Sequence, residues 1–324
     1  MSKYIGRLVN VGLARETTRG TPVTAQYWMP KTSVAFFDHV NKFQSQMSYG
    51  TIGEAAQAYK TNEWSEGNFE TELNDKSFGL ILYALFGTLN TTGPTDSAYT
   101  HTFSLQNDSQ HDSLTITIAD PDRTDQFSLC MLESLEINMV PDEPVMVTAA
   151  FKGRSGRQVA TASVSYAQFS KFLGRHAVLK LASTTAGLSA ASSISIKSLK
   201  MEFKKNLMVN NVLGTVWPED ILNQKFEITG EFELDLDDRT YQNLQLDGSY
   251  RALRLQMTNS DVLIGSSSRP DFKIDLSRVH FEGWEPKVEN DELVTQKINF
   301  RALYDISNAN VVNSCTLINN VSSY

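Results

Sequence analysis

Polar and apolar residues alternate in short segments along most of the 324-residue chain. A period of two is typical of a β-strand that has one buried and one exposed face. The expected strands are residues 4–14, 32–40, 99–105, 113–119, 127–139, 145–151, 196–205, 251–257, 272–282 and 293–301. Loops rich in Gly, Thr, Ser and Pro lie between them, among them 16–24 and 88–98. The pattern therefore predicts a mainly β protein.

One segment changes from the strand period to the helix period, and it occurs twice. Residues 67–81 (GNFETELNDKSFGLI) align without a gap with residues 230–244 (GEFELDLDDRTYQNL). In both copies the alternation predicts a strand, and the residues after it predict a short helix. A match of this length indicates an internal duplication.

Each predicted helix has signals at both ends. Asn and Asp are good N-caps, an acid after the cap suits the positive end of the helix dipole, and glycine often ends a helix. The residues concerned are Asn74, Asp75 and Gly87 in the first copy and Asp237, Asp238 and Gly248 in the second. We therefore expect one short flanking α-helix in each copy, with the first more deeply buried because apolar residues dominate it.

The repeat extends beyond this segment and divides the chain into two tandem homologous domains. Residues 4–7 (YIGR) recur as 172–175 (FLGR), and the pair Phe-Lys at 151–152 recurs as Phe-Arg at 300–301. We expect domain 1 at residues 1–152, a linker at 153–165, domain 2 at 166–306, and a C-terminal tail or edge strand at 307–324.

A long polar connection precedes the repeated strand in each half, at residues 42–66 and 206–229. The two connections share a Gly-Thr-aliphatic motif at 50–52 and 214–216. Connections of this length usually have a function, so a projecting hairpin or arm is one interpretation and a plain surface loop is the other.

The charge balance argues against a protein that grips nucleic acid. The chain has 29 Lys and Arg against 37 Asp and Glu, a net charge of −8, and an acidic surface repels phosphates. Cys130 and Cys315 lie in different halves without metal-ligand spacing, so neither a disulfide framework nor a zinc site is expected. The sequence has no signal-peptide pattern and no membrane-spanning run, so we expect soluble synthesis in a cytosol.

Catalytic and metal-binding patterns are weak in this sequence. The acids at 231–238 alternate along one strand face, which a solvated surface explains better than a hydrolase carboxylate pair. A partial calcium-loop match at 235–240 lacks a required ligand and glycine. The dispersed histidines and the tryptophans are expected to be structural, namely His39, His101, His111, His176, His280, Trp28, Trp64, Trp217 and Trp284. We expect no enzyme activity, no cofactor and no metal.

Two segments near the N-terminus resemble a known family. Residues 12–24 (GLARETTRGTPVT), followed by 27–30 (YWMP), look like the opening of the tail tube, or major tail, proteins of long-tailed bacteriophages. Residues 66–73 and the helix expected at 75–86 are similar to the strand and helix of that family. The resemblance is to the non-contractile, siphovirus type, here with a duplicated tube domain.

The resemblance implies a β-sandwich or half-barrel with one flanking helix per domain, rings stacked into a hollow tube, and a long hairpin that contacts the next ring. The candidates for these inter-ring arms are Tyr49, Gly50, Ile52, Leu213, Gly214 and Val216. It also implies a place in the virion tail after synthesis in the host cytoplasm. The implied partners are further copies of the chain, the tape measure, tail tip and terminator proteins, and double-stranded DNA in transient, non-specific passage, without a membrane.

Family members are mostly single domains arranged as hexamers, so we expect three of these two-domain chains to form one pseudo-sixfold ring. DNA must slide through the lumen, and acidic side chains repel phosphate over a Debye length of about 8 Å. The candidates for the lumen lining are Glu70, Glu72, Glu231, Glu233 and Asp235. Alternatively, these acids face outward and keep the tube soluble.

Two other functional classes stay open at this stage. A carbohydrate- or receptor-binding β module of a virion would need exposed aromatic residues that converge on a groove. An acid-pair hydrolase would need a cleft with paired carboxylates.

Overall fold

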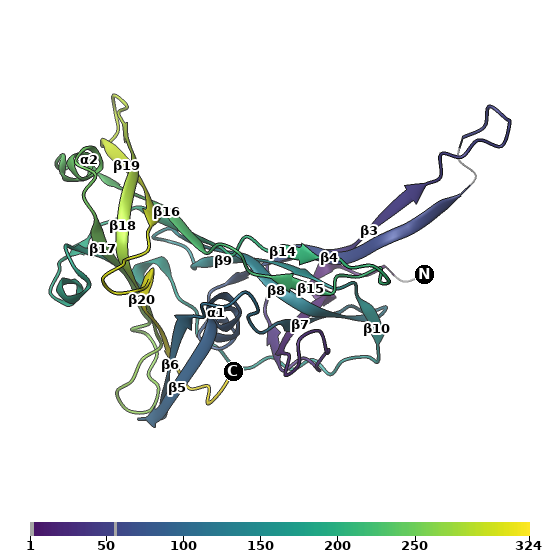
Figure 1. The fold of residues 1–324 in the computed structure, drawn as a ribbon. Coiled ribbons are helices and arrows are strands. Elements are labelled where there is room, and N and C mark those ends of the chain that lie inside the picture. The colour runs from purple at the N-terminus through teal and green to yellow at the C-terminus, as the bar shows by residue number, and fades with distance from the viewer. Residues whose placement is uncertain (1–2, 55–56) are drawn as a thin grey trace.

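The computed structural model describes residues 3–54 and 57–324 and is mainly β (Figure 1). The strands of the N-terminal half are β1 (Asn10–Arg15), β2 (Tyr27–Met29), β3 (Ser33–Gln44), β4 (Ala58–Glu72), β5 (Gly87–Thr95), β6 (Ala98–Leu105), β7 (Leu114–Ala119), β8 (Thr124–Met139), β9 (Met146–Gly153) and β10 (Arg157–Val159). Those of the C-terminal half are β11 (Ala177–Ala182), β12 (Ser193–Ile194), β13 (Ser198–Lys204), β14 (Met208–Asn210), β15 (Asp220–Leu222), β16 (Glu227–Asp235), β17 (Arg251–Thr258), β18 (Asp271–Lys287), β19 (Thr295–Ala302) and β20 (Val312–Asn319). The α-helices are α1 (Phe78–Phe86) and α2 (Thr240–Leu246), and the 3-10 helices are η1 (Gly6–Leu8), η2 (Gly174–His176) and η3 (Thr185–Ser189).

The mainly β prediction is confirmed, and each expected strand overlaps an observed one. The first expected strand begins later than predicted, because 6–8 form the 3-10 turn η1 before β1. The prediction of a loop at 88–98 is wrong. Most of that segment is β5, which pairs with β6 from Gly87 opposite Leu105 to Thr95 opposite Ala98. Its β-branched threonines suit a strand once a partner is available.

The helix α1 is buried on all sides, with all nine of its residues in the core. It ends as predicted, because Gly87 adopts a left-handed φ of 87° and donates its N–H to the carbonyl of Tyr83. Asn74 caps the turn just before the helix, where its Oδ1 accepts the N–H of Ser77 at 2.9 Å. Asp75 is not in the first helical turn as expected. It is buried and accepts the N–H of Ser170 at 2.6 Å instead.

The helix α2 is the less buried of the two, as predicted, with Leu244 as its buried residue. Asp238 lies before its first turn and accepts the N–H of Thr240 at 2.8 Å. Gly248 follows the helix with a φ of 62° and donates to the carbonyl of Gln245. Tyr241 packs edge-on against Phe232, with the ring centroids 5.7 Å apart, so the helix is held to its preceding strand.

One continuous antiparallel sheet crosses both halves of the chain. Its strands pair in the order β3, β4, β9, β8, β13, β16, β19 and β18. The β8–β13 contact joins the two halves, with Phe203 opposite Leu135 and Leu199 opposite Met139. A single sheet therefore runs through the chain from the N-terminal hairpin to β18.

The two halves use the same pairing order. The N-terminal half runs β3, β4, β9, β8, β7, β1 and β2, and the C-terminal half runs β13, β16, β19, β18, β17, β11 and β12. A register shift occurs at corresponding places, between Leu132 and Ser134 in β8 and between Phe281 and Gly283 in β18. Leu132 and Phe281 lie opposite the repeated phenylalanines Phe151 and Phe300. These pairs define which residues of the two halves correspond.

The core is one hydrophobic cluster that contains side chains from both halves. The helix α1 lies near its centre, between strands of the two halves (Figure 1). Phe78 of α1 packs edge-on against Phe272 of β18 with centroids 5.4 Å apart, and Phe86 packs against Phe203 of β13. An all-round apolar helix is expected where protein surrounds it on every side.

The C-terminal segment also connects the halves. The strand β20 pairs with β18 on one edge and with β6 on the other, so Cys315 lies opposite both Ile274 and Phe103. It is thus a strand with partners on both edges, rather than the tail or edge strand expected from sequence. The 153–165 segment, which was expected to be a linker, contains the short strand β10, and β10 pairs with β8 at Thr124–Gln126.

Candidate functional site

The polar face of the continuous sheet contains the acids that the sequence suggested for the lumen. Their neighbours Phe69, Leu73 and Phe232 are buried in the core, so the alternating acids lie on the opposite face. The acids are half-buried, and they are Glu70 and Glu72 on β4 and Glu231, Glu233 and Asp235 on β16. The structure therefore places candidates from both halves on one surface.

Register alignment across the sheet makes this surface continuous. Directly opposite residues on neighbouring strands form one row, namely Glu70, Thr148, Glu136, Glu202, Thr229 and Arg301. Such rows form when strands pair without a break, because opposite side chains then share a face. The row passes from β4 to β19 through the β8–β13 contact.

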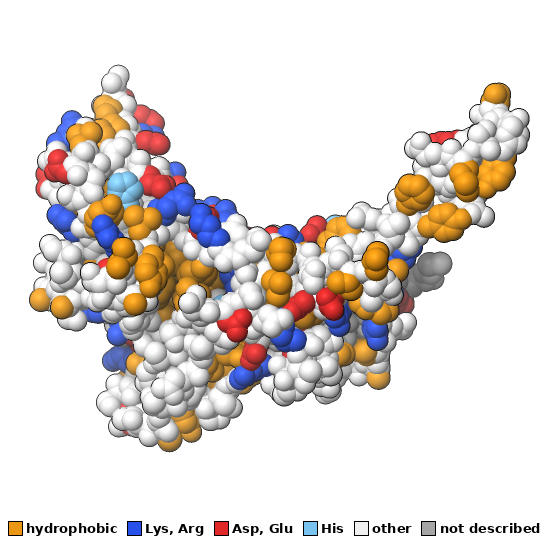
Figure 2. Space-filling model, viewed as in Figure 1, with side chains coloured by type: hydrophobic (Ala, Val, Ile, Leu, Met, Phe, Trp, Pro, Cys, Tyr) orange, Lys and Arg blue, Asp and Glu red, His pale blue; other side chains and the backbone are white. Residues whose placement is uncertain are grey.

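Lysines interleave with these acids, and the sequence reasoning missed them. Lys297 Nζ lies 2.8 Å from the Glu231 carboxylate, and Lys197 Nζ lies 2.6 Å from that of Asp235. Lys171 pairs with Glu72 in the same way. The hydrogen bond that Lys297 donates to the Glu231 carboxylate raises the pKa of Lys297. Figure 2 shows basic and acidic side chains close together along the hollowed upper margin of the molecule.

The remaining two acids have other neighbours. Glu70 accepts a hydrogen bond from Ser33 Oγ at 3.2 Å, while Glu233 lies opposite Lys297 on β19 and contributes to the raised pKa of that lysine. Lys200, at a polar position of the expected 196–205 strand, is the sequence signal for a mixed surface. Its pairing with an acid could not be read from one strand alone.

The first polar connection forms a projecting hairpin at the end of β3 and β4 (Figure 1). The arm candidates Tyr49, Gly50 and Ile52 lie at its tip, where Ile52 is fully exposed and Gly50 has a left-handed φ of 74°. Further exposed apolar residues lie along β3 of the hairpin, including Phe37 and Phe43. Figure 2 shows several hydrophobic side chains on the projecting part of the molecule.

The second polar connection folds back onto the N-terminal half. It forms the β14–β15 hairpin, and the Val216 carbonyl accepts the N–H of Glu63 at 2.7 Å. Arg154 donates to the carbonyl of Pro218 at 2.9 Å. The other candidates of this arm, Leu213 and Gly214, are exposed, and Gly214 has a φ of 93°. The corresponding segments of the two halves therefore take different paths.

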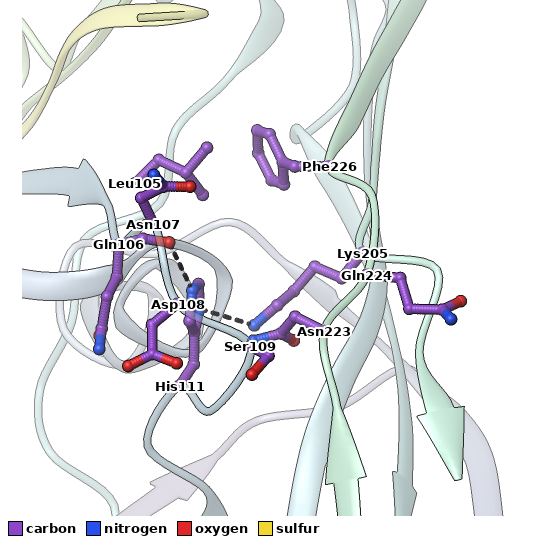
Figure 3. Close-up of a pocket in the computed structure, with 10 residues that line it drawn as sticks. All are labelled: Leu105, Gln106, Asn107, Asp108, Ser109, His111, Lys205, Asn223, Gln224 and Phe226. Atoms are coloured by element: carbon purple, nitrogen blue, oxygen red, sulfur yellow. Dashed lines mark hydrogen bonds between the residues drawn. The ribbon is translucent and has the colours of Figure 1, made fainter.

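A buried lysine lies where this second arm leaves β13. Lys205 is 1% exposed, and its Nζ donates to the carbonyl of Ala84 in the last turn of α1 at 2.8 Å. A helix C-terminus favours a cation. Lys205 Nζ also lies 3.1 Å from His111 Nδ1, beside an open cavity of about 280 Å³ (Figure 3). The lysine thus links a strand of the C-terminal half to the central helix of the N-terminal half.

The charge states of this pair follow from its surroundings. His111 Nε2 lies 2.9 Å from the Gln106 carbonyl, which only accepts, so Nε2 holds the proton and Nδ1 accepts from Lys205. Burial lowers the pKa of Lys205 to about 7, assisted by the nearby charge of Arg19. Burial, together with the charge of Lys205, lowers the pKa of His111 to about 4. The histidine is neutral at physiological pH.

Arg19 completes the contact between the halves. This residue lies in the glycine- and threonine-rich loop of the N-terminal half, and its guanidinium pairs with Asp220 of β15. It also donates to the carbonyl of Ile221 at 3.0 Å, and Ile221 is buried in a small cluster with Leu129 and Met131. Charged and apolar contacts together hold the folded-back arm in place.

The histidines and tryptophans follow the structural interpretation only in part. His101 and His176 are buried, with Asn319 and Asp261 as their side-chain partners. Trp28 is in the core as predicted, but Trp217 is exposed, which corrects the prediction for that residue. Across residues 3–54 and 57–324, no group of three or more His, Cys, Asp or Glu side chains could hold a metal ion. Those ranges also contain no helix that is long and apolar enough to cross a membrane.

A comparison with family models identifies the family of this chain. The model of the phage tail tube protein family matches residues 6–302. The chain belongs to this family. As a tail tube protein it has a structural role in the virion tail, where family members assemble with their own copies and with other tail components. A comparison with curated proteins gave no match.

Proposed function

We propose that three copies of this tail tube protein form one ring with pseudo-sixfold symmetry, and that such rings stack into a hollow tube. The observation that supports the proposal most directly is the β8–β13 contact, where the second half continues the sheet of the first half. Because both halves have the same strand order, the step that relates the first half to the second can be repeated from chain to chain. Repeated head-to-tail contacts close into a ring when the rotation permits.

The proposal includes a duplication of the tube domain, with domains at 1–152 and 166–306 joined by the linker 153–165. The sequence repeat at 67–81 and 230–244 supports it, together with the corresponding register shifts in β8 and β18. The two domains differ in their long polar connections. The β3–β4 hairpin of the first domain projects from the molecule, whereas the connection of the second domain packs against the first domain.

The polar face of the sheet lines the lumen in this proposal. The opposite face is covered by the core, so the polar face is the side of the sheet that remains open. Its cations Lys197, Lys200 and Lys297 each have a carboxylate partner. Phosphates therefore meet few free cations, while Glu70 and Glu233 add negative charge. DNA can slide along such a surface during ejection without being held.

The projecting hairpin is the contact to the next ring in this proposal. Its exposed side chains, including Tyr49 and Ile52, gain cover when they dock on another copy. The tip of the folded-back arm, with Leu213 and Gly214, is the second candidate contact, and Val216 anchors it. The same proposal includes three points that the family resemblance implies. The tail is of the non-contractile, siphovirus type. The tape measure, tail tip and terminator proteins are partners, and the protein is made in the host cytoplasm.

Negative-stain electron microscopy of the purified, concentrated protein tests this proposal. We expect rings or hollow tubes, and class averages of end-on views should show three-fold symmetry with six lobes. Rings that contain six whole chains would refute the trimer. A protein that stays monomeric at every concentration, also after addition of a purified tail tip, would refute self-assembly into a tube.

A further inference from the structure

Among residues 3–54 and 57–324, two strand edges on opposite sides of the continuous sheet lack a partner. Within the described residues, β3 pairs only with β4, so its other edge is open. The N-terminal part of β18 has β17 along one edge up to Val279, but from Gly283 to Lys287 the pairings of β18 are with β19 alone. Open edges of this length pair readily with another chain.

The internal contact between β8 and β13 shows how such edges fit together. It is antiparallel, with Leu199 opposite Met139 and Lys204 opposite Ser134. The strand β13 corresponds to β3, because Leu199 and Val34 lie opposite the repeated Phe232 and Phe69. The strand β8 corresponds to β18, through the register shifts described above. The open edges of β3 and β18 are therefore the counterparts of two edges that already pair.

We infer that the open edge of β3 pairs with the open edge of β18 in a second copy of this chain, in the register of the β8–β13 contact. This inference rests on the proposed ring and names the residues that would close it. Transfer of the internal register places Val34 opposite Val288, Ala35 opposite Lys287, Phe36 opposite Pro286, Phe37 opposite Glu285, Asp38 opposite Trp284 and His39 opposite Gly283.

The apolar pattern of β18 fits this pairing. In β8, the alternate residues Leu135, Ile137 and Met139 are buried under the internal contact. Their counterparts are Trp284 and Pro286 in β18 and Val288, the residue that follows the strand. Val288 is 70% exposed in the single chain, so the edge presents an apolar side chain that a partner strand would cover.

The inferred contact has fewer polar links than the internal one. At the internal contact Lys200 pairs with Glu136 at 3.0 Å, whereas the position of Lys200 in β3 is occupied by Ala35. Val40 occupies the position that corresponds to the buried Lys205. Pro286 has no N–H, so this position can contribute only its carbonyl oxygen to backbone pairing.

Disulfide trapping between Ala35→Cys and Lys287→Cys tests the register. Directly opposite residues of antiparallel strands have Cα atoms about 4.5 to 5.5 Å apart, which lies within the range for a disulfide. The native Cys130 and Cys315 are buried and do not compete. We expect assembled, oxidised protein to run as covalent trimers on a non-reducing denaturing gel, and reduction should return single chains.

Two matched variants control this experiment. Lys200→Cys with Asn138→Cys is the corresponding internal pair, and it should form a disulfide within one chain whether or not rings assemble. Ala35→Cys with Glu285→Cys is shifted by two positions, and it should give far fewer covalent trimers. Electron microscopy of each sample records whether rings or tubes are present.

The outcomes separate the inference from the proposed function. Rings without a disulfide between positions 35 and 287, in a sample where the internal pair oxidises, would overturn the β3–β18 pairing and leave the ring intact. Trapping of the shifted pair in preference would also overturn the register. Wild-type protein that forms no rings or tubes under any condition would refute the proposed function, and the pairing with it.

Discussion

Replacement of Lys205 by methionine is expected to change how the stability of this protein depends on pH. The side chain is 1% exposed, and it donates to the Ala84 carbonyl and to His111 Nδ1. Its pKa is lowered by burial to about 7, from an ordinary value of 10.5. Between these two values the unfolded chain binds a proton at this site that the folded chain does not.

The sign of the effect follows from this difference in bound protons. Stability rises with pH wherever the unfolded state binds more protons, so the contribution of Lys205 to folding becomes more favourable as the pH rises from about 7 toward 10.5. Each full pKa unit is worth about 1.4 kcal/mol. At pH 7 the folded state is only half deprotonated at Lys205, so the first part of this pH range contributes less than the full slope. The free energy of unfolding of the wild type should therefore rise by about 2 kcal/mol between pH 7 and pH 9 because of Lys205.

Chemical unfolding of the wild type and Lys205→Met at pH 7 and pH 9 measures this gain. The variant loses a donor to the Ala84 carbonyl, which costs about 1 to 3 kcal/mol, but that cost is the same at both pH values. His111 contributes little to this comparison, because burial, the larger cause of its lowered pKa, remains in the variant. Relative to the variant, the wild type should therefore become more stable by about 2 kcal/mol at the higher pH.

Lys204→Met is the matched control, because Lys204 is the preceding residue and its side chain is 47% exposed. Its stability difference from the wild type should be nearly equal at the two pH values. An equal difference for Lys205→Met as well would refute the interpretation that this lysine changes protonation on folding near neutral pH.

Two further predictions concern the sheet. Gly67→Ala should lower the free energy of unfolding, measured in urea, by about 3 kcal/mol or more. Gly67 has a φ of 149°, and an added Cβ would lie 1.9 Å from the Ala35 carbonyl oxygen. The control is Asn68→Ala at the next, exposed position, which should change the free energy of unfolding by no more than about 0.5 kcal/mol. A comparable loss for both variants would contradict the backbone argument. Replacement of Glu70, Glu231 and Glu233 by lysine reverses the charge at three positions of the polar face. The tubes should stay intact, but DNA ejection from phage particles should slow because free cations would then bind phosphate. A DNA-binding dye measures the ejection rate. The control reverses exposed acids outside the sheet strands, namely Asp108, Asp122 and Asp247. An unchanged ejection rate would count against the lumen assignment.

The local elements of this fold could be predicted from the sequence. Strand period, helix end signals and the repeat each depend on residues that are close together along the chain, so the β4–α1 and β16–α2 units were found with their glycine stops. Both long polar connections form hairpins, and the alternation of acids with Phe69 and Phe232 correctly placed those acids on one strand face. The segment at 88–98 was missed, because its strand depends on pairing with β6 rather than on its own apolar pattern.

The long-range arrangement depended on tertiary structure. Periodicity shows which face of a strand is apolar, but it does not show which edge meets which, because backbone hydrogen bonds are the same for every residue except proline. The β8–β13 contact, the crossing of β20 to β6, and the lysine partners of the acids on the polar face therefore appeared only in the folded chain. The same holds for Lys205, whose sequence neighbours give no sign that burial beside α1 would lower its pKa.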